Sequence, residues 1–251
     1  MSEFQQICLS QGGRESGREG GSQSVTCKLI GLRPRGSETK MAINASKTKM
    51  MIFNFSDKKF TTRVKLNNQN VEIVDQVKLL GTIVTSDLKW DRNTSEIVKK
   101  ANTRMTILTK VAEFCPSVDE LKNIYILFIR SLLEQSAVVW HSGLTKENES
   151  DLERVQKSAV KIILNNQYKN YKDALLKLDL EELSERRKSL CHKFAKKSIV
   201  TGKFNELFQK NDKKHTMKTR KSEVYKVTYA RTEKLKRSSI LYMQRLLNES
   251  N

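Results

Sequence analysis

The chemistry that this sequence offers most clearly is the binding of a polyanion by clustered cations. Residues 185–251 hold 19 lysines and arginines against 6 acidic residues, and they supply most of the net charge of +19 of the 251-residue chain. Tyr225, Tyr229 and Tyr242 are interleaved with these cations. Lysine and arginine neutralise phosphates, while tyrosine rings stack on bases or sugars. The pattern favours a nucleic acid as the partner, with a solvated basic surface as the alternative.

The predicted contacts with nucleic acid begin on one helix near the start of this basic segment. The helical spacing predicts a helix from about Leu183 to Val200, with Gly202 as its C-terminal cap. The cations that we expect to bind on it are Arg186, Arg187, Lys193, Lys196 and Lys197. Binding would be non-specific, because contacts with phosphates carry no direct sequence information.

Patterns that would indicate an enzyme or a cofactor site are missing from the sequence. It contains no Asp-Asp pair, no Gly-Lys-Ser/Thr phosphate loop and no Cys-x-x-Cys motif. Cys191 and His192 are neighbours on a predicted helix, and adjacent helical residues point in different directions, so the two cannot chelate one metal ion alone. We expect Cys191 to be packed in the core. The acidic pair Glu181-Glu182 precedes a helix, where negative charge is favourable. We therefore predict no catalytic residue, no metal and no cofactor.

The compartment follows from what the sequence lacks. The most apolar stretch, 124–140, contains Arg130 and Glu134 and is too short to span a bilayer. The basic segment has few large apolar residues that could insert into a membrane surface. The four cysteines are far apart, which fits a reducing compartment. We expect an intracellular protein, in the nucleus or cytoplasm, with no membrane partner; the oligomeric state is open.

The sequence patterns of the elements that position these residues predict an α+β fold that is predominantly helical. Residues 1–40 hold seven of the ten glycines and no apolar periodicity, which predicts a disordered leader. Residues 41–91 include alternating apolar runs at 48–84 that predict a small antiparallel sheet. Gly81 lies inside a strand-like run, where it would mark a bulge or a close backbone approach. Residues 92–201 predict a helical bundle, and residues 202–251 a basic, poorly ordered region with a short helix near Ile240–Leu247.

The bundle is expected to contain helices with recognisable starts and stops. We predict helices from Thr94 to Phe114, from Ser117 to Trp140, from Thr145 through Ile163, and from Tyr171 to Leu178. Ser117 and Glu120 form a capping-box pattern. The segment that ends at Trp140 is apolar nearly all round, which predicts a buried central helix.

An ordered set of sequence blocks resembles a known family. The blocks are Asn44–Lys49, Lys78–Asp91, Ile124–Ser131, Leu152–Leu164 and the Arg186-Arg187 region. Together they are similar to the region that follows the polymerase active site in reverse transcriptases of jockey-type non-LTR retrotransposons. The similarity covers about residues 41–251. It implies the last palm strands and a primer-grip-like hairpin in 41–91, followed by a thumb-like helical bundle in 92–201.

The resemblance also implies that this chain lacks the metal-binding aspartates of the polymerase. Polymerase chemistry in this family needs metal-bound aspartates in an aromatic-x-Asp-Asp turn, and no such pair precedes Asn44. The chain is therefore expected to be a catalytically inactive C-terminal fragment of an RNA-directed DNA polymerase that retains non-specific binding of RNA, DNA or their hybrid. The alternatives are the non-catalytic half of a split reverse transcriptase, a helical protein-interaction module, and a relic without function.

The resemblance adds further residues to the expected nucleic-acid contacts. Lys47 matches a lysine near the departing pyrophosphate, and Leu79, Leu80 and Gly81 match the primer grip. Lys99, Lys100 and Arg104 match the face of the first thumb helix that is turned to the template–primer duplex. The alternative for the primer-grip residues is a core strand with a bulge. The alternative for the three cations of the thumb helix is a solvated helix face. We expect Trp90 and Trp140 to be hydrophobic anchors rather than stacking platforms for bases.

Overall fold

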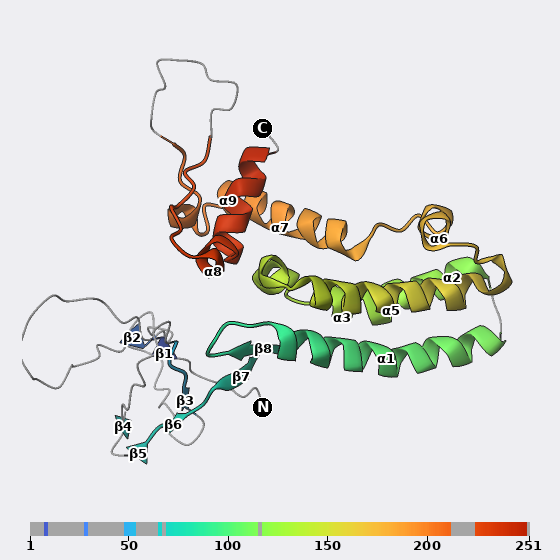
Figure 1. Ribbon diagram of the computed structural model, residues 1–251, viewed down its shortest axis with the longest axis horizontal. Coiled ribbons are helices and arrows are strands. Elements are labelled where there is room, and N and C mark those ends of the chain that lie inside the picture. The colour runs from blue at the N-terminus through green and yellow to red at the C-terminus, as the bar shows by residue number, and fades with distance from the viewer. Residues whose placement is uncertain are drawn as a thin grey trace, which may run out of the picture. The chain divides into compact units, whose positions relative to one another are not determined.

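The structure is a computed structural model that describes residues 8–9, 28–29, 48–53, 65–66, 69–114, 117–211 and 224–249. The chain divides into two units, Met1–Lys89 and Trp90–Asn251. The described part of the first unit consists of short strands, and that of the second is almost entirely helical (Figure 1). The predicted fold class, predominantly helical with a small antiparallel sheet before the helices, is confirmed.

The strands of the first unit pair two by two. They are β1 (Cys8–Leu9), β2 (Lys28–Leu29), β3 (Lys49–Met50), β4 (Lys65–Leu66), β5 (Gln69–Asn70), β6 (Glu72–Ile73), β7 (Gln76–Leu79) and β8 (Thr82–Thr85). The pairs β1–β2, β4–β5 and β7–β8 are antiparallel, whereas β3 pairs with β6 in parallel. A purely antiparallel meander is therefore the wrong description of this region. Apart from β1 and β2, the expected disorder of 1–40 concerns residues outside the described part of the chain.

The strongest of these ladders is the β7–β8 hairpin. Leu80 and Gly81 form its two-residue turn, with φ angles of 48° and 88°. Two successive positive φ angles are typical of the primed turns whose twist matches that of the flanking strands. The prediction of a bulge within one continuous strand is wrong, because the chain reverses at this glycine. A hairpin is thus present where the family resemblance implies one.

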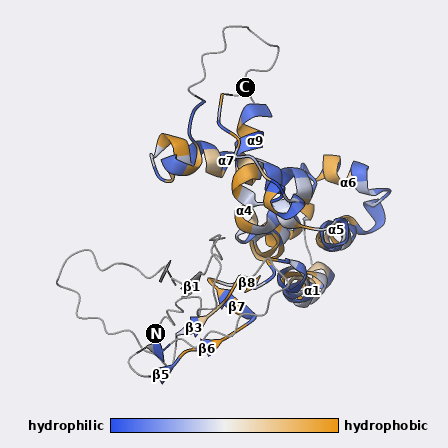
Figure 2. Cartoon of the chain, turned by 60° about the vertical axis from the view of Figure 1, so that its left-hand side comes forward, coloured by the Kyte–Doolittle hydropathy of each residue, from blue (hydrophilic) through white to orange (hydrophobic). Residues whose placement is uncertain are grey.

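The second unit is built from helices of very different lengths. The long ones are α1 (Asp91–Phe114), α5 (Lys146–Leu164) and α7 (Leu183–Val200). The shorter ones are α2 (Val118–Ile124), the π-helix η2 (Tyr125–Arg130), α3 (Ser131–Glu134), α4 (Ala137–Trp140), η3 (His141–Gly143), η4 (Asn165–Gln167), α6 (Tyr171–Lys177), η5 (Asn205–Leu207), α8 (Glu233–Lys236) and α9 (Ser239–Glu249). Helices α1 and α5 pack along each other, and both carry hydrophilic as well as hydrophobic residues (Figure 2).

The helix starts follow the capping rules. The capping box at Ser117 is complete, because the Ser117 hydroxyl accepts from the backbone N–H of Glu120 while the Glu120 carboxylate accepts from that of Ser117. Thr145 caps α5 by accepting from the N–H of Asn148, as predicted. Each cap satisfies an amide that has no partner within its helix.

The predicted continuous helix that ends at Trp140 is interrupted. Its buried residues are spaced by four, at Leu121, Tyr125, Ile129, Leu133 and Ala137. A regular α-helix with this spacing would rotate its buried face by about 40° every four residues. The wider π turn of η2 offsets this rotation, so that one side stays in the core. Ser136 then breaks the helix with a left-handed φ of 53°.

The same segment is also less buried than its composition predicts. Leu127 and Phe128 are more than half exposed, as is the neighbouring Ile107 of α1. The prediction of a helix buried all round is therefore wrong, since burial follows the four-residue spacing and leaves the opposite side bare.

Both tryptophans are hydrophobic anchors, as predicted. Trp140 is fully buried, and its indole N–H donates to the carbonyl of Gln135 at the helix break, with an N–O distance of 2.9 Å. Trp90 packs so closely on Gly143 that a Cβ there would lie 2.6 Å from the indole nitrogen. Gly143 is thus required for close approach.

The C-terminal helix belongs to the folded unit. Met243, Leu246 and Leu247 of α9 form a buried cluster with Cys191 and Ala195 of α7. The expectation of poor order is wrong for Ser239–Glu249, because α9 carries an apolar face that covers the corresponding face of α7. Residues 212–223 lie outside the described part of the chain.

Candidate nucleic-acid interface

Helix α7 presents three lysines on one exposed face. Its bounds, Leu183–Val200, agree with the prediction, and Gly202 follows it with a φ of +68°. At about 100° per residue, Lys193, Lys196 and Lys197 fall within one quarter to one third of the helix circumference. All three side chains are exposed. The opposite side of the helix is buried through Arg187, Cys191 and Ala195.

The environment of these three lysines contains no counter-charge from the described part of the chain. Within the described ranges, no carboxylate lies at ion-pair distance from Lys193, Lys196 or Lys197. An exposed ammonium group that is not committed to an internal partner can neutralise a phosphate without first breaking a salt bridge. This face is the strongest geometric support for the predicted nucleic-acid contacts.

Arg187 has a different environment and is removed from the predicted interface. Its side chain is fully buried. The guanidinium lies 5.9 Å from the ring centroid of Trp140, and its Nε–H donates to Nδ1 of His141 over 3.4 Å. Burial lowers the pKa of Arg187, and the charges of Glu153, Glu149 and Glu134 oppose this shift. A side chain in this position stabilises the bundle and cannot reach a phosphate.

Arg186 is also engaged inside the protein. Its Nε–H donates to the carboxylate of Glu134, which pairs with Arg130 as well at 3.5 Å. Arg186 is half-buried, so its charge is largely committed to this pair. Of the five cations predicted on α7, the structure thus leaves three free to bind an external anion.

His141 connects α7 to α9. Tyr242 of α9 places its hydroxyl 3.3 Å from Nε2 of His141, and the two rings meet edge to face. Burial, together with the charges of Arg187 and Lys188, lowers the pKa of His141 to about 4. The imidazole is therefore neutral at physiological pH, which allows its Nδ1 to accept from Arg187. Tyr242, predicted as a stacking residue, is partly buried here.

A polar network that the sequence did not reveal holds the start of α7. The carboxylate of Glu153, on α5, accepts from the backbone N–H of Leu183 over 3.2 Å, and it also accepts from the Tyr171 hydroxyl. Gln156 is fully buried, and its amide nitrogen donates to Tyr171 and to the carbonyl of Glu181, each over 2.9 Å. Burial raises the pKa of Glu153, while the bond from Tyr171 opposes that shift.

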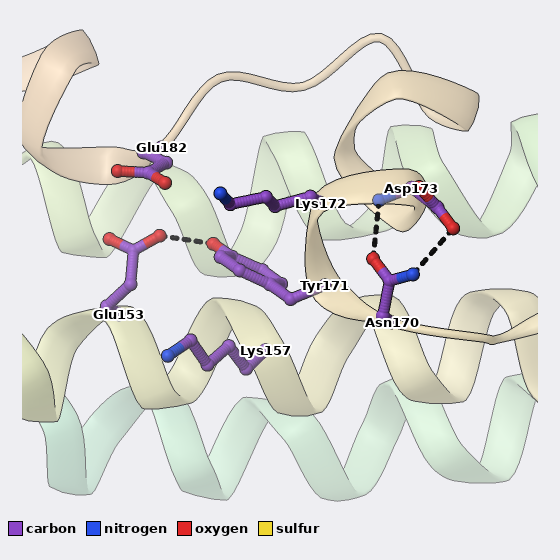
Figure 3. A pocket seen from close by; sticks show the side chains of 7 residues that line it. All are labelled: Glu153, Lys157, Asn170, Tyr171, Lys172, Asp173 and Glu182. Carbon is purple, nitrogen blue, oxygen red and sulfur yellow. Dashed lines mark hydrogen bonds between the residues drawn. The ribbon is translucent and has the colours of Figure 1, made fainter.

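Glu153 and Tyr171 of this network also border a shallow pocket of about 690 Å³ (Figure 3). Its lining residues are Glu153, Lys157, Asn170, Tyr171, Lys172, Asp173 and Glu182. Their polar groups largely satisfy one another: Tyr171 donates to Glu153, Asn170 caps α6 through the N–H of Asp173, and Lys157 lies 5.2 Å from the Tyr171 ring centroid. These bonds position α6 and α7.

The predicted contacts on α1 are only partly free. Lys99 is exposed, whereas Lys100 pairs with Glu96 at 3.2 Å. Arg104 donates through Nη1 to the carbonyl of Phe128, so it connects α1 to η2. Of the three cations predicted to contact nucleic acid on α1, Lys99 is therefore the one that remains exposed and without an ion pair among the described residues.

The remaining predicted contacts lie in the first unit. Leu79 and Leu80 are exposed at the β7–β8 turn, Leu80 to 88%, and Gly81 is half-buried. An exposed turn of this kind fits the primer-grip expectation better than the alternative of a core strand. Lys47 lies outside the described residues.

The described residues offer no metal site or membrane span. No group of three or more histidine, cysteine or carboxylate side chains among them could hold a metal ion. Cys191 is buried as predicted, and burial raises the pKa of its thiol to about 11. No helix in the described part of the chain is long and apolar enough to cross a membrane.

Comparisons with protein-family models, with curated proteins and with solved structures find no match to this chain. The resemblance to jockey-type reverse transcriptases therefore stays a prediction that is based on the sequence blocks alone.

Proposed function

We propose that this protein binds nucleic acid without sequence specificity and is a catalytically inactive relative of the palm-end and thumb region of non-LTR retrotransposon reverse transcriptases. The observation that carries the proposal is the exposed face of α7, where Lys193, Lys196 and Lys197 have no internal counter-charge among the described residues. Lys99 of α1 adds a further exposed cation. The ordered sequence blocks support the family relationship.

The proposed lack of catalysis follows from the sequence. The chain contains no adjacent pair of aspartates, and two metal ions held by carboxylates are what activates the primer hydroxyl and stabilises the leaving pyrophosphate in polymerases. Binding and polymerisation are separable, since phosphate contacts need only correctly placed cations.

The exposed apolar side chains of Ile107, Leu127 and Phe128 favour a second candidate function, a helical protein-interaction module. Apolar contacts become no weaker as salt rises, whereas phosphate contacts are lost. Salt dependence therefore separates the two functions.

Fluorescence anisotropy of the full chain with a labelled RNA–DNA primer–template tests the proposal. We expect binding whose logarithmic affinity falls linearly with the logarithm of the salt concentration, with a slope of about −0.9 for each phosphate neutralised on a B-form duplex. Primer extension with Mg²⁺ and deoxynucleotides should yield no product. Absence of binding at physiological salt, or an affinity independent of salt, would contradict the proposed function.

A further inference from the structure

Two exposed phenylalanines lie beside the α7 lysines. Phe194 is 40% exposed and Phe204, which follows the end of α7, is 58% exposed. Their ring centroids are 6.4 Å apart, and the ring planes are inclined by 34°. Neither residue belongs to the buried cluster of Cys191, Ala195 and Phe208 on the same segment. Both rings therefore present aromatic surface to the solvent beside the exposed face of α7.

The backbone of Phe204 has an unusual conformation. Its φ and ψ are 63° and 28°, in the left-handed region that bulky side chains rarely adopt. The carbonyl of Phe204 accepts from the N–H of Leu207 over 2.9 Å, and Phe208, the residue after Leu207, is buried. The segment after α7 is thus tethered to the bundle while it presents Phe204 at the surface.

The surroundings of the two rings are almost uniformly positive. Residues 190–210 contain five lysines, and Glu206 is their one acidic residue. Lys193, Lys196 and Lys197 share the exposed face of α7, and Lys203 directly precedes Phe204. Aromatic rings set among unpaired cations suit a ligand that has both flat apolar faces and a negative backbone.

We propose that Phe194, Phe204 and the surrounding lysines form a stacking platform for unpaired nucleotides of single-stranded RNA or DNA. The inference rests on the proposed function and specifies its ligand. Bases within a duplex are stacked on one another, whereas an unpaired base has a free face that can stack on an aromatic side chain. The charge favours a nucleic acid over a protein partner, and an anionic membrane would require more apolar side chains than the patch contains.

The first test replaces both rings. The double variant Phe194→Leu/Phe204→Leu keeps apolar side chains at both positions but removes the aromatic faces. We expect its affinity for a labelled 20-mer of oligouridine to fall roughly 5- to 150-fold, the range that corresponds to losing one base stack. Its affinity for an RNA–DNA duplex should change less than about twofold, since lysines carry that contact. Phe114→Leu, at an 88% exposed position that ends α1, is the matched control.

A second test places a reporter at the platform. In Phe204→Trp, stacking of a base should quench the new tryptophan fluorescence, while the native tryptophans are buried. We expect quenching by oligouridine and none by heparin, a polyanion without bases. Equal quenching by both polyanions, or none by oligouridine, would overturn the proposal. A blue shift with phosphatidylserine vesicles and no quenching by oligouridine would overturn it in favour of a membrane surface.

Failure of this proposal and failure of the proposed function give different results. If the wild-type chain binds both duplex and single strand, and the double leucine variant binds the single strand equally well, the stacking platform is wrong and non-specific binding stands. If the wild-type chain binds neither probe, both proposals are wrong.

Discussion

The two halves of helix α7 contain similar numbers of cations in opposite environments. In the first half, Arg187 is fully buried and Arg186 pairs with Glu134. In the second half, Lys193, Lys196 and Lys197 are exposed and unpaired within the described part of the chain. From the sequence alone both halves predicted phosphate contacts. In the structure the two arginines of the first half lie inside the bundle, whereas the three lysines of the second half are exposed.

The difference shows what decides the role of a cation on a helix. The first half packs beside carboxylates from earlier segments, Glu134 of α3 and Glu153 of α5, and beside the indole of Trp140. Arginine suits such a site because its planar guanidinium is weakly hydrated and stacks on aromatic rings. Lysine is strongly hydrated, which fits the exposed half.

The largest expected effect comes from breaking the buried half. Arg187→Ala removes the contacts with Trp140 and His141 and leaves a cavity in the bundle, so it should lower the free energy of unfolding by about 2–5 kcal/mol. Urea denaturation measures this change. Lys193→Ala is the matched control on the exposed half and should stay within about 0.5 kcal/mol. Similar losses in both variants would contradict the distinction between the halves.

A smaller effect is expected from pH, through His141. Burial depresses its pKa to about 4 from the ordinary value of 6.5. Between these values the unfolded state binds more protons than the folded state, so stability should decrease as the pH falls from 6.5 to 4. The loss should be at most about 1.4 kcal/mol per pH unit, and it should level off below pH 4.

The contribution of His141 has to be isolated from that of other groups. The raised pKa of Glu153 acts in the opposite direction, because protonation of that buried carboxyl favours the folded state. The measurement is therefore the difference between the pH–stability curves of the wild type and of His141→Gln. Parallel curves from pH 7 to 4 would show that His141 does not titrate as its burial requires.

The smallest effect is expected in the loop after the exposed half. Phe204→Gly relieves the left-handed strain at this position and should stabilise the protein by up to about 1 kcal/mol. Thermal unfolding followed by circular dichroism would detect this as an unchanged or slightly raised Tm. A fall in Tm of several degrees would mean that the Phe204 ring is needed for packing and has not been placed at the surface for binding.

Local sequence patterns predicted the local features of the fold. The bounds of α7, the capping box at Ser117 and the cap at Thr145 depend on residues within a few positions of one another. Propensity, periodicity and capping act over this range, so single-sequence reasoning captures them. The burial of Cys191 and Trp140 followed from their apolar character.

The features that were mispredicted depend on contacts between distant residues. Arg187 looks like any other lysine or arginine of the basic segment until α5 and α4 surround it, and His141 is 46 positions away along the chain. Glu153 could not be identified as a cap of α7, because its partner Leu183 lies 30 positions further on. Phe194 and Phe204 were missed because their exposure is set by the path of the chain after Gly202.

The most direct test of the central claim is a charge reversal on the exposed face of α7. Lys193→Glu/Lys196→Glu/Lys197→Glu is compared with Lys110→Glu/Lys146→Glu/Lys169→Glu, which reverses three exposed lysines elsewhere in the helical unit and changes the net charge equally. Binding to an RNA–DNA duplex is measured by anisotropy across a salt series. We predict that the α7 variant reduces the magnitude of the salt slope by about 2–3, as expected for three lost phosphate contacts, and that the control retains most of it. Equal loss in both variants would show that total charge, and not this face, binds the nucleic acid.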